Sequence, residues 1–577
     1  MRWASCFFAV AILIGARCVP CGAALRAGAS AQTVRFMRDV PPPPAANVSL
    51  AAARNEWESY QVLLRSDAPA KITGIECSHL RGPEGAIIPV SEMEIYRQHQ
   101  MHITRGTYRN ESFKPGWYPD ALIPLLHPLT RKPLAGGRLA AVPFELPAGE
   151  THGFWVDVHV PADARPGTYD GVCAVVFDGG RRAEVAVRLK VWDFALPRVS
   201  TMHTAFGSPA GRMRAYYRER AAAGKEPEPA DWQAIEEQCA DLVTRHRINA
   251  APPPALLSPQ RRPDGSYEIS PENVKALRRF IDRYHVNAVM VPNPSALFKD
   301  PAAQQAELRA WLAAWDRAAA ALGAPDVLFY TYLRDEPNDA EAYKFCQIWG
   351  KAIREAKSVV KVLVVEQTWP QDEKWGDLYG AVDIWCPLFC LHRQDSALER
   401  IALGEIVWTY TALCQGKEPS PWWHIDYPLL NYRVPAWIAW KYRMRGLLYW
   451  GGMSYWREVE DPWTDAWTYG RGRDGRGTRV YNGEGTLVYP ARAVGYDGIA
   501  PSLRLKALRD SIEDYEYLAI LERAGKRAEA EKIVGPLAES FFAWEKNPSA
   551  WTAARAALAD LITAGAPRGA ERTGAHD

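Results

Sequence analysis

Two adjacent acidic residues, Asp335 and Glu336, follow an apolar run in the middle of the 577-residue chain and precede Pro337. The run, residues 327–333, has the β-branched and aromatic content of a buried strand. Two carboxylates at the end of such a strand are costly to place, because each loses water beside a like charge. Folded proteins keep such pairs mainly where a shifted pKa is useful, so the pair predicts a hydrolase active site.

The same triplet also has a purely structural interpretation. Asp, Glu and Pro are all favoured in the first turn of a helix, and Asn338–Asp339 could cap the helix that follows. Pro337 is expected to end the strand and to hold the backbone of Glu336 in an extended conformation. The position of the pair, after the fourth of eight expected strands, favours the catalytic interpretation.

The elements around the pair predict a (β/α)8 TIM-type barrel over residues 198–525. Short apolar segments alternate there with amphipathic stretches, and barrels of this kind place catalytic groups at the C-terminal ends of their strands. A doubly wound sheet is the alternative, but no glycine-rich phosphate-binding sequence follows the first strand. The expected strands are 201–206, 248–251, 286–291, 327–333, 362–365, 382–387, 406–410 and 446–450, and the clearest helices are 230–246, 272–284, 303–322, 340–356 and 433–444.

The regions that flank the expected barrel have other textures. Residues 32–197 alternate short β-rich runs with Pro and Gly, which predicts a β-sandwich. Residues 526–577 have Ala-rich amphipathic patterns followed by a polar end, which predicts C-terminal helices and a disordered tail. The chain is therefore expected to be multidomain.

The first 31 residues have the pattern of a secretory signal peptide. Arg2 precedes a short apolar segment, and Ala29-Ser30-Ala31 fits a cleavage site before Gln32. Cys18 and Cys21 raise the question of a lipid anchor, but their flanking residues fit such a site poorly. We expect an exported protein, periplasmic or extracellular, without a membrane span, because no later stretch is long and apolar enough.

Composition narrows the class of protein further. A net charge of +2 shows none of the basic excess typical of nucleic-acid binding. The ten cysteines are scattered, and no His or Cys spacing suggests a metal, so we expect no metal and no cofactor. The 23 Trp and 25 Tyr residues suit large cores or sugar-stacking platforms. The oligomeric state stays unknown at this level.

The search for a second catalytic carboxylate leaves two mechanisms open. A conventional retaining glycosidase needs a nucleophile about 5–5.5 Å from its acid/base. Glu366 is the one good candidate, because Glu405 and Asp383 fall at the entry ends of their expected strands. Alternatively, the 2-acetamido group of the substrate attacks the anomeric carbon itself. One carboxylate then orients the amide and another acts as the acid, roles that adjacent Asp335 and Glu336 can supply.

Four stretches carry a family resemblance: Tyr332–Pro337, Gly446–Trp450, Gly485–Pro490 and Ser502–Leu518. Through them the chain, from roughly residue 50 to 525, resembles glycoside hydrolase family 123, whose characterised members are β-N-acetylgalactosaminidases, together with uncharacterised bacterial relatives. The resemblance implies a β-sandwich followed by a barrel and a retaining, substrate-assisted mechanism. It implies Asp335 as the group that polarises the acetamide and Glu336 as the acid/base. A preference for galactosamine over glucosamine is implied by the family alone.

Other side chains at or after the strand ends are expected to contact the sugar. Trp450 would form a wall under the acetamido sugar, and Tyr410 would donate a hydrogen bond to the acetamide oxygen. The other expected contacts are Trp408, Trp385, Trp369, Asp426, Asn293 and His203. Packing inside the barrel is an equal alternative for each of the aromatic residues, and it is the favoured one for Asn293 and His203.

These observations lead to one main functional hypothesis and two alternatives. The main one is an exported exo-acting β-N-acetylhexosaminidase that cleaves galactosamine-terminated glycans or oligosaccharides with retention. The first alternative is a conventional retaining glycosidase of non-acetamido sugars, with Glu336 as acid/base and Glu366 as nucleophile. The second is a non-catalytic glycan-binding protein that keeps the barrel and its aromatic side chains.

Overall fold

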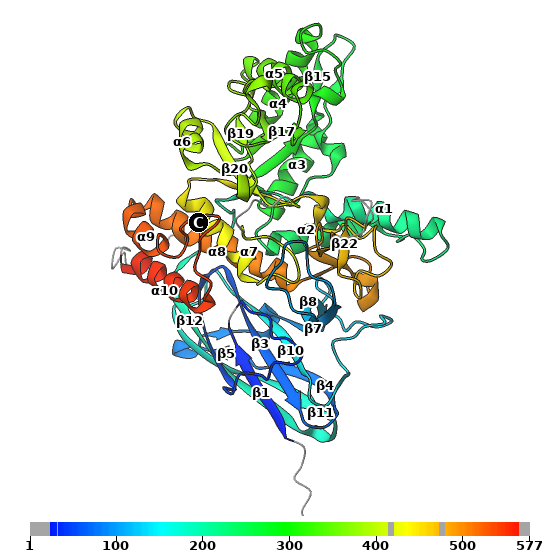
Figure 1. Cartoon of the computed structure of the whole chain (residues 1–577), viewed down its shortest axis with the longest axis vertical. Coiled ribbons are helices and arrows are strands. Elements are labelled where there is room, and N and C mark those ends of the chain that lie inside the picture. Colours follow the sequence, from blue (N-terminus) through cyan, green and yellow to red (C-terminus); the bar gives the residue numbers. More distant parts are fainter. Residues whose placement is uncertain (1–23, 32, 414–419, 472–478, 565–577) are drawn as a thin grey trace, which may run out of the picture.

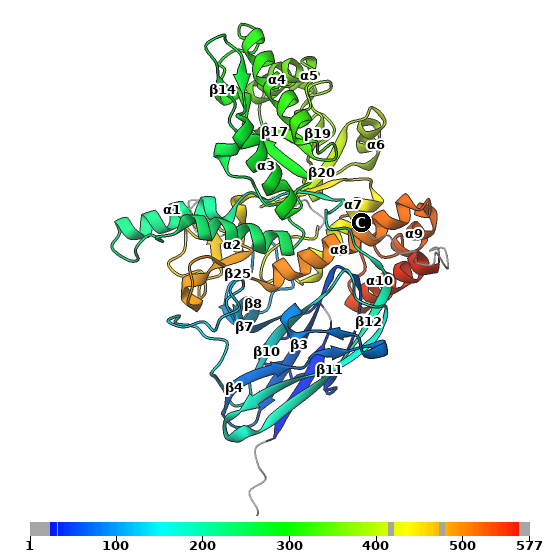
Figure 2. The same ribbon diagram turned by 180° about the vertical axis from the view of Figure 1, so that it is seen from behind.

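The computed structural model describes residues 24–31, 33–413, 420–471 and 479–564. Most of the expected signal peptide and the expected C-terminal tail lie outside these ranges. A sheet-rich N-terminal region and a parallel sheet with surrounding helices form the two ends of the molecule, and helices α7 and α8 lie between them (Figures 1 and 2). The expectation of several domains is therefore confirmed.

The N-terminal region consists of two mainly antiparallel sheets that share one core, as the expected β-sandwich requires. Val62, Leu64 and Val156 of one sheet are buried against Val175, Val185 and Val187 of the other. The first sheet has the order β1 (Leu25–Ser30), β3 (Glu56–Ser66), β10 (Thr151–Val160), β7 (Met93–Ile103) and β8 (Gly116–Pro124). The main path of the second is β2 (Asn47–Arg54), β12 (Arg182–Ala195), β11 (Gly167–Phe177), β4 (Ala70–Cys77) and β9 (Phe144–Leu146), with β5 (Leu80–Arg81) and β6 (Ile87–Ile88) at its side.

Strand β1 lies before the boundary expected at residue 31. Leu25–Ser30 pairs antiparallel with β3 along its full length, and Ala29 is buried. In this structure the first strand of the sandwich thus starts at Leu25, and Ala29 and Ser30 belong to that edge strand. Cleavage before Gln32 stays a prediction.

The parallel sheet has seven strands in the order β13-β21-β20-β19-β18-β17-β16. Neighbouring strands are parallel throughout, so the first and last strands of the domain lie side by side as in a barrel. The expected eight-stranded barrel is not formed, because residues 248–251 belong to no strand. The bounds are β13 (His203–Ala205), β16 (Ala288–Val291), β17 (Leu328–Asp335), β18 (Lys361–Val365), β19 (Ile384–Trp385), β20 (Ile406–Tyr410) and β21 (Gly446–Leu448).

Side-chain amides occupy the place of the missing strand. The backbone N–H of Asn249 donates to the Thr204 hydroxyl at 2.7 Å, and its Nδ2 donates to Asn287 Oδ1 at 2.7 Å. The Asn287 amide in turn donates to the carbonyl of Met202 at 3.1 Å. These bonds join β13 to the entry of β16 and satisfy backbone groups that a ladder would otherwise pair. The near-barrel is closed there without an eighth strand.

Helices connect most of the strands, as the sequence predicts. Two were not expected, α1 and α6, because neither has a long amphipathic pattern. Between β18 and β19 there is one short 3-10 turn. The helices are α1 (Pro209–Ala222), α2 (Trp232–Arg245), α3 (Pro271–Tyr284), α4 (Gln305–Leu322), α5 (Ala340–Glu355), α6 (Gln394–Ala402), α7 (Leu430–Lys441), α8 (Leu503–Arg523), α9 (Arg527–Val534) and α10 (Pro548–Ala564).

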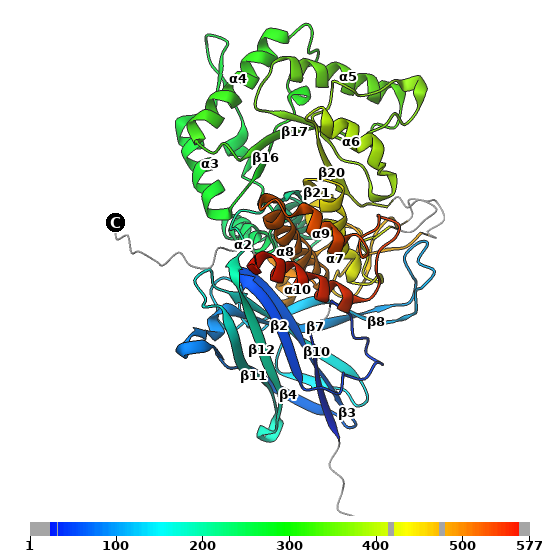
Figure 3. The same ribbon diagram turned by 90° about the vertical axis from the view of Figure 1, so that its left-hand side faces the viewer.

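Helix α8 joins the near-barrel to the sandwich through buried ion pairs. Arg504 contacts Asp120 of β8 at 2.9 Å, and Lys506 contacts Asp157 of β10 at 2.6 Å. Breaking such a pair leaves an uncompensated buried charge, which typically costs about 3–5 kcal/mol. The Ser502–Leu518 stretch is thus an interdomain connection, which explains why it characterises the scaffold more than the chemistry. Helix α10 packs on β12 beside it (Figure 3).

Among the residues that the structure describes, no helix is long and apolar enough to cross a bilayer.

Candidate active site

The carboxylates of Asp335 and Glu336 lie where β17 ends, at the C-terminal edge of the parallel sheet. The register between β17 and β18 shifts at Tyr332/Arg334, so one extra residue is inserted just before the pair. Such a bulge reverses the alternation of side chains and re-aims those that follow it. The backbone N–H of Glu336 still donates to Val365 O at 3.1 Å, which ties the pair to the edge of the sheet.

Two expectations about this pair are wrong. Both side chains are exposed, so water reaches the two adjacent carboxylates and the cost of desolvation is small. Glu336 is not extended but has φ 39°, a left-handed conformation that is rare for a residue before proline. Strained backbone of this kind persists where surrounding bonds hold it, and it occurs preferentially at functional sites.

Each of the two carboxylates accepts a hydrogen bond from a different tyrosine. Tyr332 Oη donates to Asp335 Oδ1 at 2.8 Å, and Tyr410 Oη donates to Glu336 Oε1. Burial raises the pKa of both phenols well above 10, so both stay protonated and act as donors. Tyr410 comes from β20 and reaches Glu336 across the interior of the sheet. The structure thus brings Tyr410 to the catalytic pair, although its partner here is Glu336.

Glu366, the candidate nucleophile, lies next to the pair in a different environment. It follows β18 and is 5% exposed, and Tyr343 Oη donates to its Oε1 at 3.2 Å. Burial raises the pKa of Glu366 to about 8, and the charge of nearby Glu336 raises it further, whereas the bonds from Tyr343 and the Gln367 backbone oppose this. A largely protonated carboxyl is a poor nucleophile at neutral pH.

Trp450 follows β21 and is held among other aromatic side chains. Its ring is half-buried and meets Tyr469 edge-on, with centroids 4.9 Å apart, and Tyr455 at 5.2 Å. Its indole N–H donates to the buried carboxylate of Glu484. These contacts fix the orientation of the ring, which suits a flat surface for a sugar.

Two expected sugar contacts are engaged in holding the site together. Asn293 donates to the carbonyls of Tyr332 and Leu333 at 3.1 and 3.0 Å, and therefore supports the end of β17. Asp426 is 7% exposed and accepts bonds from the Thr107 N–H at 2.7 Å and the Thr107 hydroxyl at 2.6 Å. Because Thr107 belongs to the β7–β8 loop, Asp426 anchors the sandwich to this face of the near-barrel, and its contact with a sugar stays a prediction.

Three other expected contacts lie away from the exit face. Trp408 is fully buried inside the near-barrel against Tyr330, and a Cβ at Gly446 would stand 2.4 Å from its ring. Trp385 points to the outer side of the sheet, because it alternates with inward Ile384, and it donates to Glu405 at 2.7 Å. His203 begins β13 at the entry end, where burial lowers its pKa to about 4. These placements favour the packing alternative for all three, and their contact with a sugar stays a prediction.

Trp369 lies in the loop after β18 and is half-buried. The guanidinium of Arg393 lies 3.6 Å above its ring, and its N–H donates to Leu391 O at 3.2 Å. One ring face is therefore covered in this structure. Its contact with a sugar stays a prediction.

Sequence reasoning missed four residues of the site. Tyr332 belongs to the quoted Tyr332–Pro337 stretch, and its place three residues before Asp335 was the available signal. Glu484 stands between two glycines, directly before the quoted Gly485–Pro490 stretch. Tyr343 and Tyr455 had no signal, because only the fold brings them to Glu366 and Trp450. Within the described ranges, no three His, Cys, Asp or Glu side chains cluster as metal ligands.

The arrangement offers two neighbouring carboxylates with separate phenol donors, an oriented indole and a third, protonated carboxyl. One of the exposed carboxyl groups, in its protonated form, can donate a proton to a leaving oxygen while the other, as a carboxylate, accepts a hydrogen bond from an N–H group. Two carboxylates on one strand end approach a substrate from the same side. This is acid-catalysed group transfer chemistry.

Comparisons with known proteins agree with this chemistry. The model of the "Glycoside hydrolase 123, catalytic domain" matches residues 319–521. A solved family 123 glycoside hydrolase from Clostridium perfringens, described for glycolipid glycan hydrolysis, has a TM-score of 0.60 at 14% identity, over 94% of this chain and 97% of that one. At that identity the likeness shows a shared fold.

Two further solved structures are less similar. A Bacteroides ovatus GH5 xyloglucanase, in complex with a XXXG heptasaccharide, has a TM-score of 0.25 at 9% identity, over 81% of this chain and 98% of that one. A glycosyl hydrolase family 2 member from Bacteroides cellulosilyticus has 0.23 at 11%, over 73% and 45%. Scores this low support no argument. None of the curated proteins matches the chain in sequence.

Proposed function

From the match of residues 319–521 to the model of the glycoside hydrolase 123 catalytic domain, we propose that this chain is an exo-acting β-N-acetylhexosaminidase that works with retention and substrate assistance. Galactosamine-terminated glycans are the proposed substrates. In this proposal the 2-acetamido oxygen attacks the anomeric carbon, Asp335 holds and polarises the amide N–H, and Glu336 gives its proton to the leaving oxygen. Export from the cell is part of the same proposal.

One observation carries the choice of mechanism: the third carboxyl, Glu366, is buried, bonded to Tyr343 and has a pKa of about 8. A conventional retaining enzyme would need this group ionised to form a covalent glycosyl intermediate. A substrate-assisted enzyme needs no such nucleophile. The separate phenol donors of Asp335 and Glu336 support a division of roles between the two neighbouring carboxylates.

The proposal predicts release of the chromophore from a chromogenic N-acetyl-β-D-galactosaminide. Glu336→Gln is expected to lower kcat by about 10²–10⁴-fold, because a positioned general acid contributes that much. Asp335→Asn is expected to lower kcat by a similar factor, because the acetamide is then no longer oriented. Substrates with activated leaving groups need little acid catalysis, so they should be cleaved better by Glu336→Gln than by Asp335→Asn. Folding of both variants is checked by their melting temperatures.

Two results would overturn the proposal. One is full activity of Glu336→Gln. The other is a pair of observations made together: an acetamido-sugar thiazoline does not inhibit this protein, and the protein cleaves non-acetamido glycosides as well as acetamido ones. Comparison of galactosaminide with glucosaminide substrates decides the proposed sugar.

A further inference from the structure

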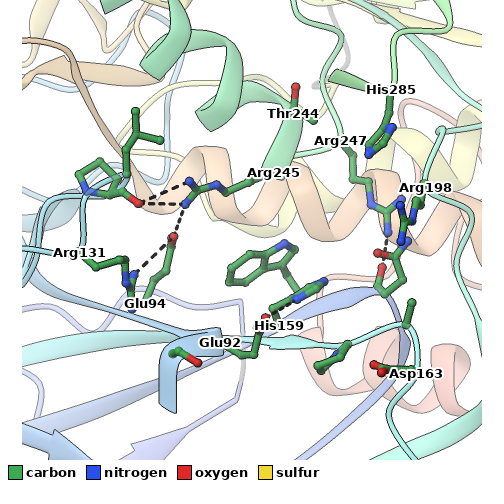
Figure 4. Close-up of a pocket in the computed structure, with 17 residues that line it drawn as sticks. Glu92, Glu94, Arg131, His159, Asp163, Arg198, Thr244, Arg245, Arg247 and His285 are labelled. Atoms are coloured by element: carbon green, nitrogen blue, oxygen red, sulfur yellow. Dashed lines mark hydrogen bonds and ion pairs between the residues drawn. The ribbon is translucent and has the colours of Figure 1, made fainter. Parts of the chain in front are cut away.

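A cavity of about 870 Å³ lies between the sandwich and the near-barrel (Figure 4). Three of its lining residues come just before segments of the near-barrel: Arg198 before β13, Arg247 before residues 248–251, and His285 before β16. They therefore stand at the entry ends, whereas Asp335 and Glu336 stand at an exit end. The cavity is separate from the candidate active site.

The basic groups of the cavity gather at one end. Figure 4 shows Arg198, Arg247 and His285 close together. Burial lowers the pKa of His285, and the charges of the two arginines lower it further. Arg198 is exposed and forms no hydrogen bond or ion pair with any residue that the structure describes. Like charges gathered in this way repel one another unless an anion is bound between them.

Arg247 is half-buried, and its guanidinium is held by two carbonyls and one buried carboxyl. Its guanidinium donates to the carbonyls of Pro197 and Asn55, both at 2.5 Å, and lies 3.4 Å from the carboxyl of Glu513. Burial raises the pKa of Glu513, and the charges of Arg247 and Arg509 oppose this. Nη1 and Nη2 of Arg247 each carry a second N–H, which can be offered to a ligand.

Two of the three acids that line the cavity have partners of their own. Glu94 contacts Arg245 at 2.5 Å and Arg131 at 3.9 Å at the opposite end (Figure 4). Glu92 contacts His159 at 2.7 Å. Asp163 is exposed and lies below the basic groups on the same side of the cavity (Figure 4). One end of the cavity thus holds paired acids, and the other holds two guanidinium groups with one exposed carboxylate.

We propose that this cavity binds an acidic saccharide, with Arg198 and Arg247 holding a carboxylate or sulfate group of a sugar. Guanidinium groups bind such oxyanions through paired N–H donors. The volume exceeds that of a small inorganic anion and suits an oligosaccharide. That the ligand is a glycan rests on the proposed function. That the ligand is negatively charged is inferred from the arginines of the cavity.

The test is calorimetric titration of the full chain with tetragalacturonate, an acidic oligosaccharide without an acetamido group, at constant ionic strength. We expect binding by the unaltered protein and at least about tenfold weaker binding by Arg198→Ala, because a charge-assisted contact is lost. Arg198→Lys should lie between them, and Arg198→Glu should abolish binding. Arg218→Ala, at an exposed position of α1 outside the cavity, is the matched control and should bind normally.

Several outcomes would overturn the inference. Absence of tetragalacturonate binding, or binding unaffected by Arg198→Glu, would remove the site. Equal binding of neutral maltotetraose would remove the charge requirement, and displacement by sodium sulfate at equal concentration would show a simple anion site. Hydrolysis of the chromogenic galactosaminide is measured in parallel. A protein that binds tetragalacturonate but hydrolyses nothing would refute the proposed function and leave the inference standing.

Discussion

Replacing Glu366 with Gln separates the two mechanisms that the sequence leaves open. The side chain is 5% exposed and accepts the Tyr343 hydrogen bond at 3.2 Å, and a Gln amide oxygen can accept the same bond. The substitution therefore mimics the protonated carboxyl in shape and hydrogen bonding. It prevents the side chain from ionising and leaves its size and its hydrogen bond to Tyr343 largely unchanged.

The magnitude follows from the raised pKa. At a pKa of about 8 the carboxyl is about 90% protonated at pH 7. The unfolded chain releases this proton near the ordinary value of 4.5, so above that pH the native state binds more protons than the unfolded state. Native stability then falls as pH rises, by about 3 kcal/mol between pH 4.5 and 7 through this group. Gln has no proton to release, so the stability of the variant does not fall with rising pH through this position.

Two assays follow. In hydrolysis of the chromogenic galactosaminide at pH 7, Glu366→Gln should keep activity within a few-fold, in contrast to Glu336→Gln. In urea unfolding at several pH values, the variant should become more stable relative to the unaltered protein as pH rises from 5 to 8. Glu341→Gln, at an exposed position in the first turn of α5, is a control that should show no such trend.

The reasoning would be refuted if Glu366→Gln lost activity as fully as Glu336→Gln. Labelling of Glu366 by a mechanism-based fluorosugar would lead to the same conclusion. Either result would restore the conventional two-carboxylate mechanism. A stability difference that does not change with pH would refute the protonated state of Glu366 independently of catalysis.

Three further predictions concern the supports of the site and the start of the fold. Tyr410→Phe removes the phenol donor to Glu336, and we expect kcat to fall about tenfold with little change in melting temperature, since one hydrogen bond to a charged group is lost; unchanged kinetics would contradict the role of the phenol. Asp426→Ala leaves a buried N–H unpaired and should lower the free energy of unfolding by about 1–3 kcal/mol in urea denaturation, whereas Asp426→Asn, which keeps an acceptor, should cost less. Under the proposed export, mass spectrometry of the mature protein should find an N-terminus at or before Leu25, because β1 belongs to the sandwich; an N-terminus at Gln32 would show that this strand is dispensable.

Local pattern was sufficient for much of the fold. Apolar runs of strand length predicted seven of the strands of the near-barrel, and the placement of Asp335 and Glu336 at a strand end followed from them. The strand expected at 248–251 does not form, because Asn249 donates hydrogen bonds to the side chains of Thr204 and Asn287 and the segment has no regular backbone pairing with a neighbouring strand. A four-residue apolar run carries no information about such side-chain bonds.

The aromatic side chains show what the sequence pattern of a strand does not predict. Trp408 and Tyr410 are two residues apart on β20 and share the inner face of the sheet, yet Trp408 is buried in the interior while Tyr410 reaches Glu336 at the rim. Trp385 follows the alternation to the opposite face. Depth along a strand depends on the register between strands, and the sequence of one strand does not specify register.

The identities and order of the residues were enough to place an acidic pair at a strand end, to relate the chain to a hydrolase family and to leave one credible third carboxylate. The tertiary structure decided what each of these groups can do. A register shift aims Asp335 and Glu336, tyrosines from different strands reach each of them, and burial keeps the proton on Glu366. Proton affinity and orientation depend on neighbours that are distant in sequence, because solvation and charge act through space rather than along the chain.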